Sequence, residues 1–121
     1  MMSKQKEVGD KGEAIAHNYL QNLGYTILES NWHFHHYEID IIAKDGDELV
    51  IVEVKSRTGT AFEHPSEAVG ARKMRFLIEA AEAYIYKTNS HADTRFDIIS
   101  IIFSNEQFEL EHYKDAFNPT A

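Results

Sequence analysis

Two short apolar runs on either side of one tight turn constrain the fold of this chain more than any other feature. Residues 37–43 and 48–55 mix apolar and acidic side chains and are separated by Lys44-Asp45-Gly46-Asp47, a typical hairpin turn. If the connection is a two-residue Gly46-Asp47 loop, even positions of the first run oppose odd positions of the second. The sequence therefore predicts an antiparallel β-hairpin with a defined register.

This register sorts the side chains of the predicted hairpin onto two faces. The first face is entirely apolar and consists of Ile39, Ile41, Val50, Val52 and Val54. The second face carries the charged residues, and consists of Glu38, Asp40, Ile42, Leu49, Ile51, Glu53 and Lys55. Asp40 would lie directly across from Glu53, with the two Cβ atoms about 5 Å apart. The apolar pattern and the acidic pattern therefore select the same register.

The paired acids predict a specific chemistry. Two carboxylates at that separation repel, so one of them stays partly protonated unless a cation lies between them. Oxygen ligands favour Mg²⁺ or Mn²⁺ over zinc, and Lys55 on the same face could position water or stabilise a phosphate under attack. The pattern fits metal-assisted phosphodiester hydrolysis. It equally fits an exposed hairpin face with a Glu–Lys ion pair that contributes less than about 1 kcal/mol.

The other apolar patterns predict two helices and three further strands around this hairpin. A polar arm over residues 1–6 precedes the first helix, whose apolar positions run from Ile15 to Leu23 and stop at Gly24. The further elements are strands over 25–32, 96–103 and 108–113 and a helix from Ser66 to Tyr86. The order is α-β-β-β-α-β-β, which predicts an α/β fold with a mixed central sheet, flanking helices and a C-terminal edge strand.

Length and composition narrow the class of protein. A chain of 121 residues fits one domain, over residues 1–121. Cysteine is absent, which excludes disulfide scaffolds, thiol nucleophiles and cysteine-bound zinc. No apolar run approaches the roughly 18 residues that span a bilayer, and the start of the chain lacks the apolar stretch of a signal peptide. We therefore expect a cytoplasmic protein without a membrane partner.

The charge is unevenly distributed along the chain. A formal net charge of −8 argues mildly against tight non-specific binding to nucleic acid. Residues 55–75 nevertheless hold five basic side chains against two acidic ones. Among them, Arg57, Arg72 and Lys73 are candidates for contacts with a phosphate backbone, and an ordinary charged surface is the alternative.

Several short motifs occur together in a specific order. They are Gly9-Asp10-Lys11-Gly12-Glu13-Ala14, Glu38-Ile39-Asp40-Ile41-Ile42-Ala43, Val52-Glu53-Val54-Lys55-Ser56-Arg57 and Arg95-Phe96-Asp97-Ile98. With them the chain resembles the PD-(D/E)XK nuclease superfamily, which has a restriction-endonuclease-like αβββαβ core. More closely, it resembles the YraN-like family of small bacterial proteins, considered distant relatives of archaeal Holliday junction resolvases. The resemblance covers nearly the whole chain.

The resemblance implies a metal site with ligands from the two strands of the hairpin and from the first helix. Asp40 and Glu53 would be metal ligands, the Val54 carbonyl oxygen would be a further ligand, and Glu13 would be directed at the metal from the first helix. The cofactor implied is Mg²⁺ or Mn²⁺.

The resemblance also implies an activity. Lys55 would be the catalytic lysine, and Glu38, which matches a family glutamate, would extend the acidic cluster. The implied protein is a Mg²⁺-dependent endonuclease that acts on DNA, including branched or junction DNA, and the analogy suggests a homodimer. Two alternatives stay open: a nucleic-acid-binding module of the same fold with weak or partner-dependent cleavage, and a protein-interaction domain with an exposed acidic face.

Other polar and aromatic residues favour structural roles. His33, His35 and His36 have no clustered partner for a zinc site, so we expect a solvated strand end. Trp32 is predicted to lie in the core. Asp97 interrupts a run of isoleucines, and we expect it to be buried and paired with Arg95 or with a residue from a helix.

Overall fold

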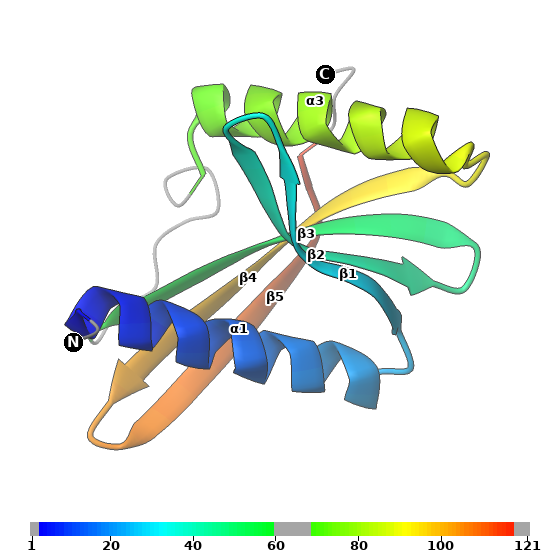
Figure 1. The fold of residues 1–121 in the computed structure, drawn as a ribbon. Coiled ribbons are helices and arrows are strands. Elements are labelled where there is room, and N and C mark those ends of the chain that lie inside the picture. The colour runs from blue at the N-terminus through cyan, green and yellow to red at the C-terminus, as the bar shows by residue number, and fades with distance from the viewer. Residues whose placement is uncertain (1–2, 60–68, 118–121) are drawn as a thin grey trace.

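The computed structural model describes residues 3–59 and 69–117, which form one five-stranded mixed sheet with a helix on each face (Figure 1). The elements of this part of the chain are α1 (Lys4–Asn22), β1 (Thr26–Phe34), β2 (Tyr37–Asp45), β3 (Glu48–Thr58), α3 (Ala71–Thr88), β4 (Thr94–Ser104) and β5 (Gln107–Phe117). The strands lie in the order β1-β2-β3-β4-β5. Strands β3 and β4 are parallel and the other neighbours are antiparallel. The predicted α/β fold and its C-terminal edge strand are confirmed.

Local sequence signals set the ends of the helices. The Ser3 side chain accepts a hydrogen bond from the Lys6 backbone N–H at 3.1 Å, so α1 begins at Lys4. The predicted polar arm over residues 1–6 is therefore wrong for Lys4 to Lys6, which are helical. Gly24 adopts a φ of 95° just after α1, as its predicted role in ending the helix requires. The predicted start of the second helix at Ser66 lies outside the described residues, within which α3 follows Gly70.

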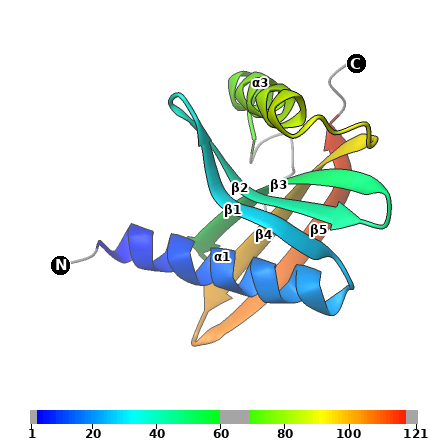
Figure 2. The ribbon, with the colours of Figure 1, turned by 45° about the vertical axis from the view of Figure 1, so that its right-hand side comes forward.

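Each helix packs a separate apolar cluster against the sheet. Leu77, Ala80, Ala81 and Tyr84 of α3 pack with Ile42, Ile51 and Ile98 on one face, and Trp32 packs against this cluster as predicted. Ala16 and Leu20 of α1 pack with Ile41, Val52 and Ile99 on the other face. Strand β4 contributes to both clusters, because β3 and β5 flank it and helices cover both of its faces (Figure 2).

The β2–β3 hairpin has the predicted register, but one apolar side chain lies on the opposite face from the one predicted. Ile42 pairs with Ile51 and Asp45 with Glu48, so the connection is the two-residue Gly46-Asp47 loop. Ile39, however, lies in the α3 cluster, whereas Ile41 lies in the α1 cluster, so the prediction of one shared apolar face is wrong.

The β2–β3 ladder ends before Ile39. Its last pair on this side is Ile41 with Val52, so the alternation within the ladder does not fix the face of Ile39. In the neighbouring strand β1, Asn31 lies between the residues paired with Ile39 and Ile41 and has a left-handed φ of 51°. The backbone of β1 is therefore irregular at the same level of the sheet.

A buried polar network lies between the sheet and α1. The Asp97 side chain accepts hydrogen bonds from Arg95 Nε at 2.9 Å and from the Asp115 backbone N–H at 3.0 Å, and its Oδ2 lies 2.7 Å from His112 Nε2. His112 Nδ1 in turn lies 3.0 Å from the hydroxyl of Tyr19 in α1. The predicted burial of Asp97 and its pairing with Arg95 are confirmed.

Candidate metal centre

The candidate site lies where β2 separates from β3. The β2–β3 ladder extends to the pair of Ile41 and Val52, and beyond this point the β1–β2 hairpin projects towards α3 (Figures 1 and 2). Asp40 is the next residue of β2, and its Oδ2 accepts the Val54 backbone N–H at 2.7 Å. A side-chain carboxylate thus takes the place of a strand carbonyl, which fixes Asp40 in the opening between the two strands.

Three carboxylates from two elements meet at this opening. Oxygen atoms of Glu13, Glu38 and Asp40 all lie within 4.8 Å of one another. Asn31 Nδ2 donates to Glu38 Oε1 at 2.7 Å and to Glu13 Oε1 at 3.0 Å, and so holds the side chains of α1 and β2 together. The structure therefore brings together three of the predicted site residues and adds Asn31, which sequence reasoning missed. The only signal for it was an asparagine inside a predicted strand.

Burial and the neighbouring acids raise the pKa values of Asp40 and Glu13. Burial and the neighbouring Glu53 carboxylate raise the pKa of Asp40 from 3.8 to about 8, although the hydrogen bond from the Val54 N–H opposes this shift. Burial and the charge of Asp40 raise the pKa of Glu13 from 4.5 to about 7. The cluster therefore retains protons near neutral pH when no cation is present, as the repulsion between like charges requires.

Glu53 reaches the same point from the other face of the sheet. Its side chain is 4% exposed, and its Oε2 lies 3.4 Å from Nζ of Lys73 in α3. It is not one of the three carboxylates with oxygens within 4.8 Å of one another, but it adjoins Asp40, and its charge raises the pKa of Asp40. Asp40 is thus the common neighbour of the carboxylates on both faces. Val54, the other predicted ligand, is half-buried and contacts Asp40 through its backbone.

An open cleft of about 550 Å³ gives access to the cluster from the α1 side. Glu13, Asn31, Glu38 and Asp40 line it together with Lys55, the predicted catalytic lysine, which is exposed. The positively charged side chain of Lys55 therefore lines the same cleft as the acids.

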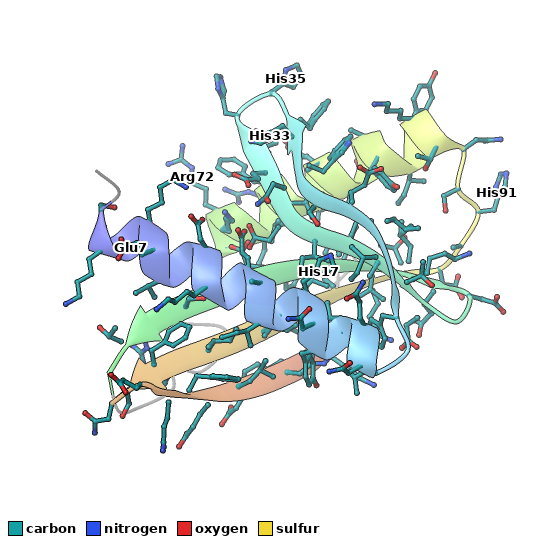
Figure 3. The ribbon with its side chains drawn as sticks, turned by 60° about the horizontal axis from the view of Figure 1, so that its bottom comes forward. Glu7, His17, His33, His35, Arg72 and His91 are labelled. Carbon is teal, nitrogen blue, oxygen red and sulfur yellow. The ribbon has the colours of Figure 1, made fainter. Side chains whose placement is uncertain are left out.

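Two of the three residues predicted to contact nucleic acid line a cleft beside the acidic cluster. Arg72 and Lys73 begin α3, and both line a second cleft that also includes Glu38. Figure 3 shows Arg72 on the side of the molecule where the tip of the β1–β2 hairpin lies. Arg57, near the end of β3, is half-buried.

The candidate ligands are carboxylate oxygens, which hard divalent cations prefer. Ligand oxygens of an octahedral Mg²⁺ lie about 2.1 Å from the ion, and so roughly 3 to 4.2 Å from one another. The separation of up to 4.8 Å among Glu13, Glu38 and Asp40 exceeds this range by well under 1 Å. Side-chain rotation alone can close that difference. The residues therefore fit Mg²⁺ or Mn²⁺, and the raised pKa values of Asp40 and Glu13 reflect a burial and a repulsion of negative charge that a cation would relieve.

The three histidines do not take part in this donor set. His33 is 66% exposed, with its Nε2 3.6 Å from Glu38 Oε2, and His35 and His36 form the turn after β1. Figure 3 shows His33 and His35 at the projecting end of the hairpin. The predicted solvated strand end is confirmed.

Comparison with known proteins places the chain in a family. The profile of the uncharacterised protein family UPF0102 matches residues 12–101. The chain belongs to this family. It is 43% identical over 116 residues to a UPF0102 protein of Parabacteroides distasonis, covering 96% of each chain. It is also 45% identical over 117 residues to a UPF0102 protein of Chlorobium chlorochromatii, covering 92% of this chain and 91% of the relative. The predicted resemblance to the YraN-like family is thereby confirmed, whereas the placement in the nuclease superfamily stays a prediction.

The UPF0102 match includes every predicted metal ligand. Residues 12–101 contain Glu13, Glu38, Asp40, Glu53 and Lys55, together with the whole of β1 to α3. The names of these relatives state no activity. Neither helix in the described part of this UPF0102 chain combines the length and the apolar character that crossing a bilayer requires.

Proposed function

We propose that this UPF0102 protein is a Mg²⁺- or Mn²⁺-dependent endonuclease that hydrolyses phosphodiester bonds in DNA, including branched DNA. The observation that supports it best is the position of Asp40 between carboxylates on both faces of the sheet. Three acids share one open cleft with Lys55, and a fourth, Glu53, contacts Asp40 from the other side. An ordinary solvated acidic surface would not bury Asp40 or raise the pKa values of Asp40 and Glu13 in this way.

The chain's own residues have distinct roles in this proposal. Asp40, Glu13 and Glu38 would hold the cation, with Glu53 and the Val54 carbonyl oxygen as further ligands. When bound, the cation would supply Lewis-acid stabilisation of the charge that develops on the phosphate. Glu53 can turn to the cation only if its contact with Lys73 loosens, and Lys73 is then free for a phosphate oxygen.

Lys55 would act on the reacting groups themselves. It is exposed in the cleft, where its ammonium group can orient the attacking water or stabilise the extra negative charge on the phosphate. The proposal therefore separates metal binding, which needs Asp40, from cleavage, which also needs Lys55.

Calorimetric titration with Mg²⁺ and Mn²⁺ tests the metal site. Wild type is expected to bind, and Asp40→Asn is expected to lose binding by at least tenfold, because it removes the charge that contacts both faces. Glu109→Gln, which removes an exposed carboxylate of β5, is the matched control and is expected to bind as wild type does. Absence of heat with both ions in wild type would contradict the proposal.

A cleavage assay tests the activity. Linear, flapped and four-way-branched DNA are incubated with Mg²⁺ and separated on a denaturing gel. Wild type is expected to cut at least one of them, and Lys55→Ala is expected to bind Mg²⁺ normally while cutting at least a hundredfold more slowly. If wild type binds DNA and metal but cuts nothing, the protein is a binding module. The ion pair between Lys73 and Glu53, which already neutralises one ligand, favours that second candidate.

A cytoplasmic location, a single domain and a homodimer belong to the same proposal. A homodimer suits a four-way junction, because the two symmetric strand cuts that such a junction offers require two metal centres. Sedimentation equilibrium of the intact protein with and without DNA tests the dimer directly.

A further inference from the structure

A second cleft adjoins the acidic one. It has a volume of about 490 Å³ and lies between the turn and start of β2 and the first turns of α3. Its walls include His36, Tyr37, Arg72, Lys73 and Phe76, so it is cationic and aromatic rather than acidic. Glu38 lines both clefts, so the two adjoin at that residue.

Flat groups are already stacked in this second cleft. The rings of Tyr37 and Phe76 lie 4.4 Å apart at 17°, and Arg72 Cζ lies 5.4 Å from the centroid of Phe76. Phe76 is thus covered by Tyr37 and by a guanidinium group. Arg72 itself is exposed, and Figure 3 shows its side chain directed outwards from the start of α3. A guanidinium supported by an aromatic ring offers its outer face to a nucleobase, since bases stack on arginine planes.

The charges beside this stack suit a phosphate backbone. Lys73 is 43% exposed and lies 3.4 Å from Glu53, which adjoins Asp40. A phosphate at Asp40 would therefore have a lysine and an arginine on its α3 side, in a chain whose net charge is −8. Two cations beside this stack, in an acidic protein, favour this path for a strand.

We infer that this cleft holds an unpaired nucleotide next to the phosphate at the candidate metal centre, with its base stacked on Arg72. The inference rests on the proposed function and narrows its substrate class. A base in duplex DNA is already stacked and paired, and bringing it onto Arg72 would require it to be flipped out. The substrate is therefore DNA with a single-stranded segment at the cut, such as a flap, rather than a fully paired four-way junction.

Binding without cleavage tests the inference first. Fluorescence anisotropy in EDTA compares a labelled DNA strand, the same strand in a blunt duplex, and an RNA strand of that sequence. Wild type is expected to bind the DNA strand at least tenfold more tightly than the duplex. Arg72→Ala and Phe76→Leu are expected to weaken single-strand binding roughly 5- to 100-fold, the effect of losing one stacked base.

Lys87→Ala is the matched control. It removes an exposed cation from the last turn of the same helix, outside the cleft, and is expected to change affinity less than twofold. Equal losses for Arg72→Ala and Lys87→Ala would reduce the effect to net charge and overturn the inference, as would equal affinity for duplex and strand. Tighter binding of RNA than of DNA would overturn the assignment to DNA. Circular dichroism of each variant verifies that the fold is retained.

Cleavage then separates this inference from the proposed function. Cutting of flapped DNA that falls with Arg72→Ala, together with slow cutting of a paired junction, supports both. Cutting of a paired junction that Arg72→Ala leaves unchanged supports the nuclease and overturns the cleft's role. Strand binding that depends on Arg72, with no cutting of any substrate, supports the cleft and overturns the nuclease.

Discussion

Replacing Asp40 by asparagine should stabilise the metal-free protein at alkaline pH. Asparagine retains an oxygen that can accept the Val54 N–H but cannot ionise. In wild type the pKa of Asp40 is raised from 3.8 to about 8, chiefly by burial and then by the Glu53 carboxylate. The charged form is thus disfavoured in the folded state only. The variant removes this penalty and leaves the hydrogen bond in place.

The sign of the effect follows from linkage. A carboxyl with a raised folded-state pKa contributes its full stability below the unfolded pKa of about 4, and that stability is lost as the pH rises towards about 8. If Asp40 alone carried the shift, the change between about pH 5 and pH 8 would be roughly 4 kcal/mol. Because Glu13, whose pKa is also raised, shares the proton of Asp40, we expect about half of this, or roughly 2 kcal/mol.

Urea unfolding in EDTA at several pH values measures the effect. The free energy of unfolding of wild type should fall by about 2 kcal/mol between about pH 5 and pH 8, and that of Asp40→Asn should fall much less. The small remaining slope would come from Glu13, whose pKa is also raised. Addition of Mg²⁺ should stabilise wild type at alkaline pH and leave the variant unchanged. Parallel pH profiles for the two proteins in EDTA would refute the reasoning.

Two further substitutions test the contacts that position the site. In Gly12→Ala the new Cβ would overlap Ser56 Oγ, so α1 must shift away from β3. We expect the free energy of unfolding in urea to fall by about 1–3 kcal/mol. Calorimetry should also show weaker metal binding. Gly9→Ala meets nothing within 4 Å and should be neutral or stabilising by up to about 1 kcal/mol. Asp97→Ala leaves a buried arginine without its main partner and should lose about 3–5 kcal/mol in urea unfolding, whereas exposed Asp93→Ala should stay within about 0.5 kcal/mol; a small effect at Asp97 would mean that the network contributes little.

The sequence predicted those features that depend on short-range patterns. Turn chemistry gave the β2–β3 register, since a two-residue Gly46-Asp47 loop fixes which residues of the two strands lie opposite each other. An acid inside the apolar run of β4 indicated a buried ion pair, which Asp97 and Arg95 form. These inferences succeed because neighbours along the chain, or across one turn, determine the outcome.

The site itself depends on contacts that the patterns do not carry. Strict alternation placed Glu38, Asp40 and Glu53 on one face, but the β2–β3 ladder ends at Ile41 and Val52, and Ile39 and Ile41 lie on opposite faces. Glu38 and Asp40 meet Glu13 on the α1 side, whereas Glu53 meets Lys73 on the α3 side. The side-chain pattern does not mark the point at which the two strands separate, so it could not show which acids share a cleft.

This arrangement couples the metal centre to the packing of α1. Glu13 reaches the cluster only because Gly12, the preceding residue, allows the helix to approach Ser56 closely. The same helix is tied at its other end to β4 through Tyr19, His112 and Asp97. A cation that draws the carboxylates together would therefore also hold α1 against the sheet, and loosening α1 would release a ligand. Metal affinity and the stability of α1 should accordingly change together, even for substitutions that leave every carboxylate in place.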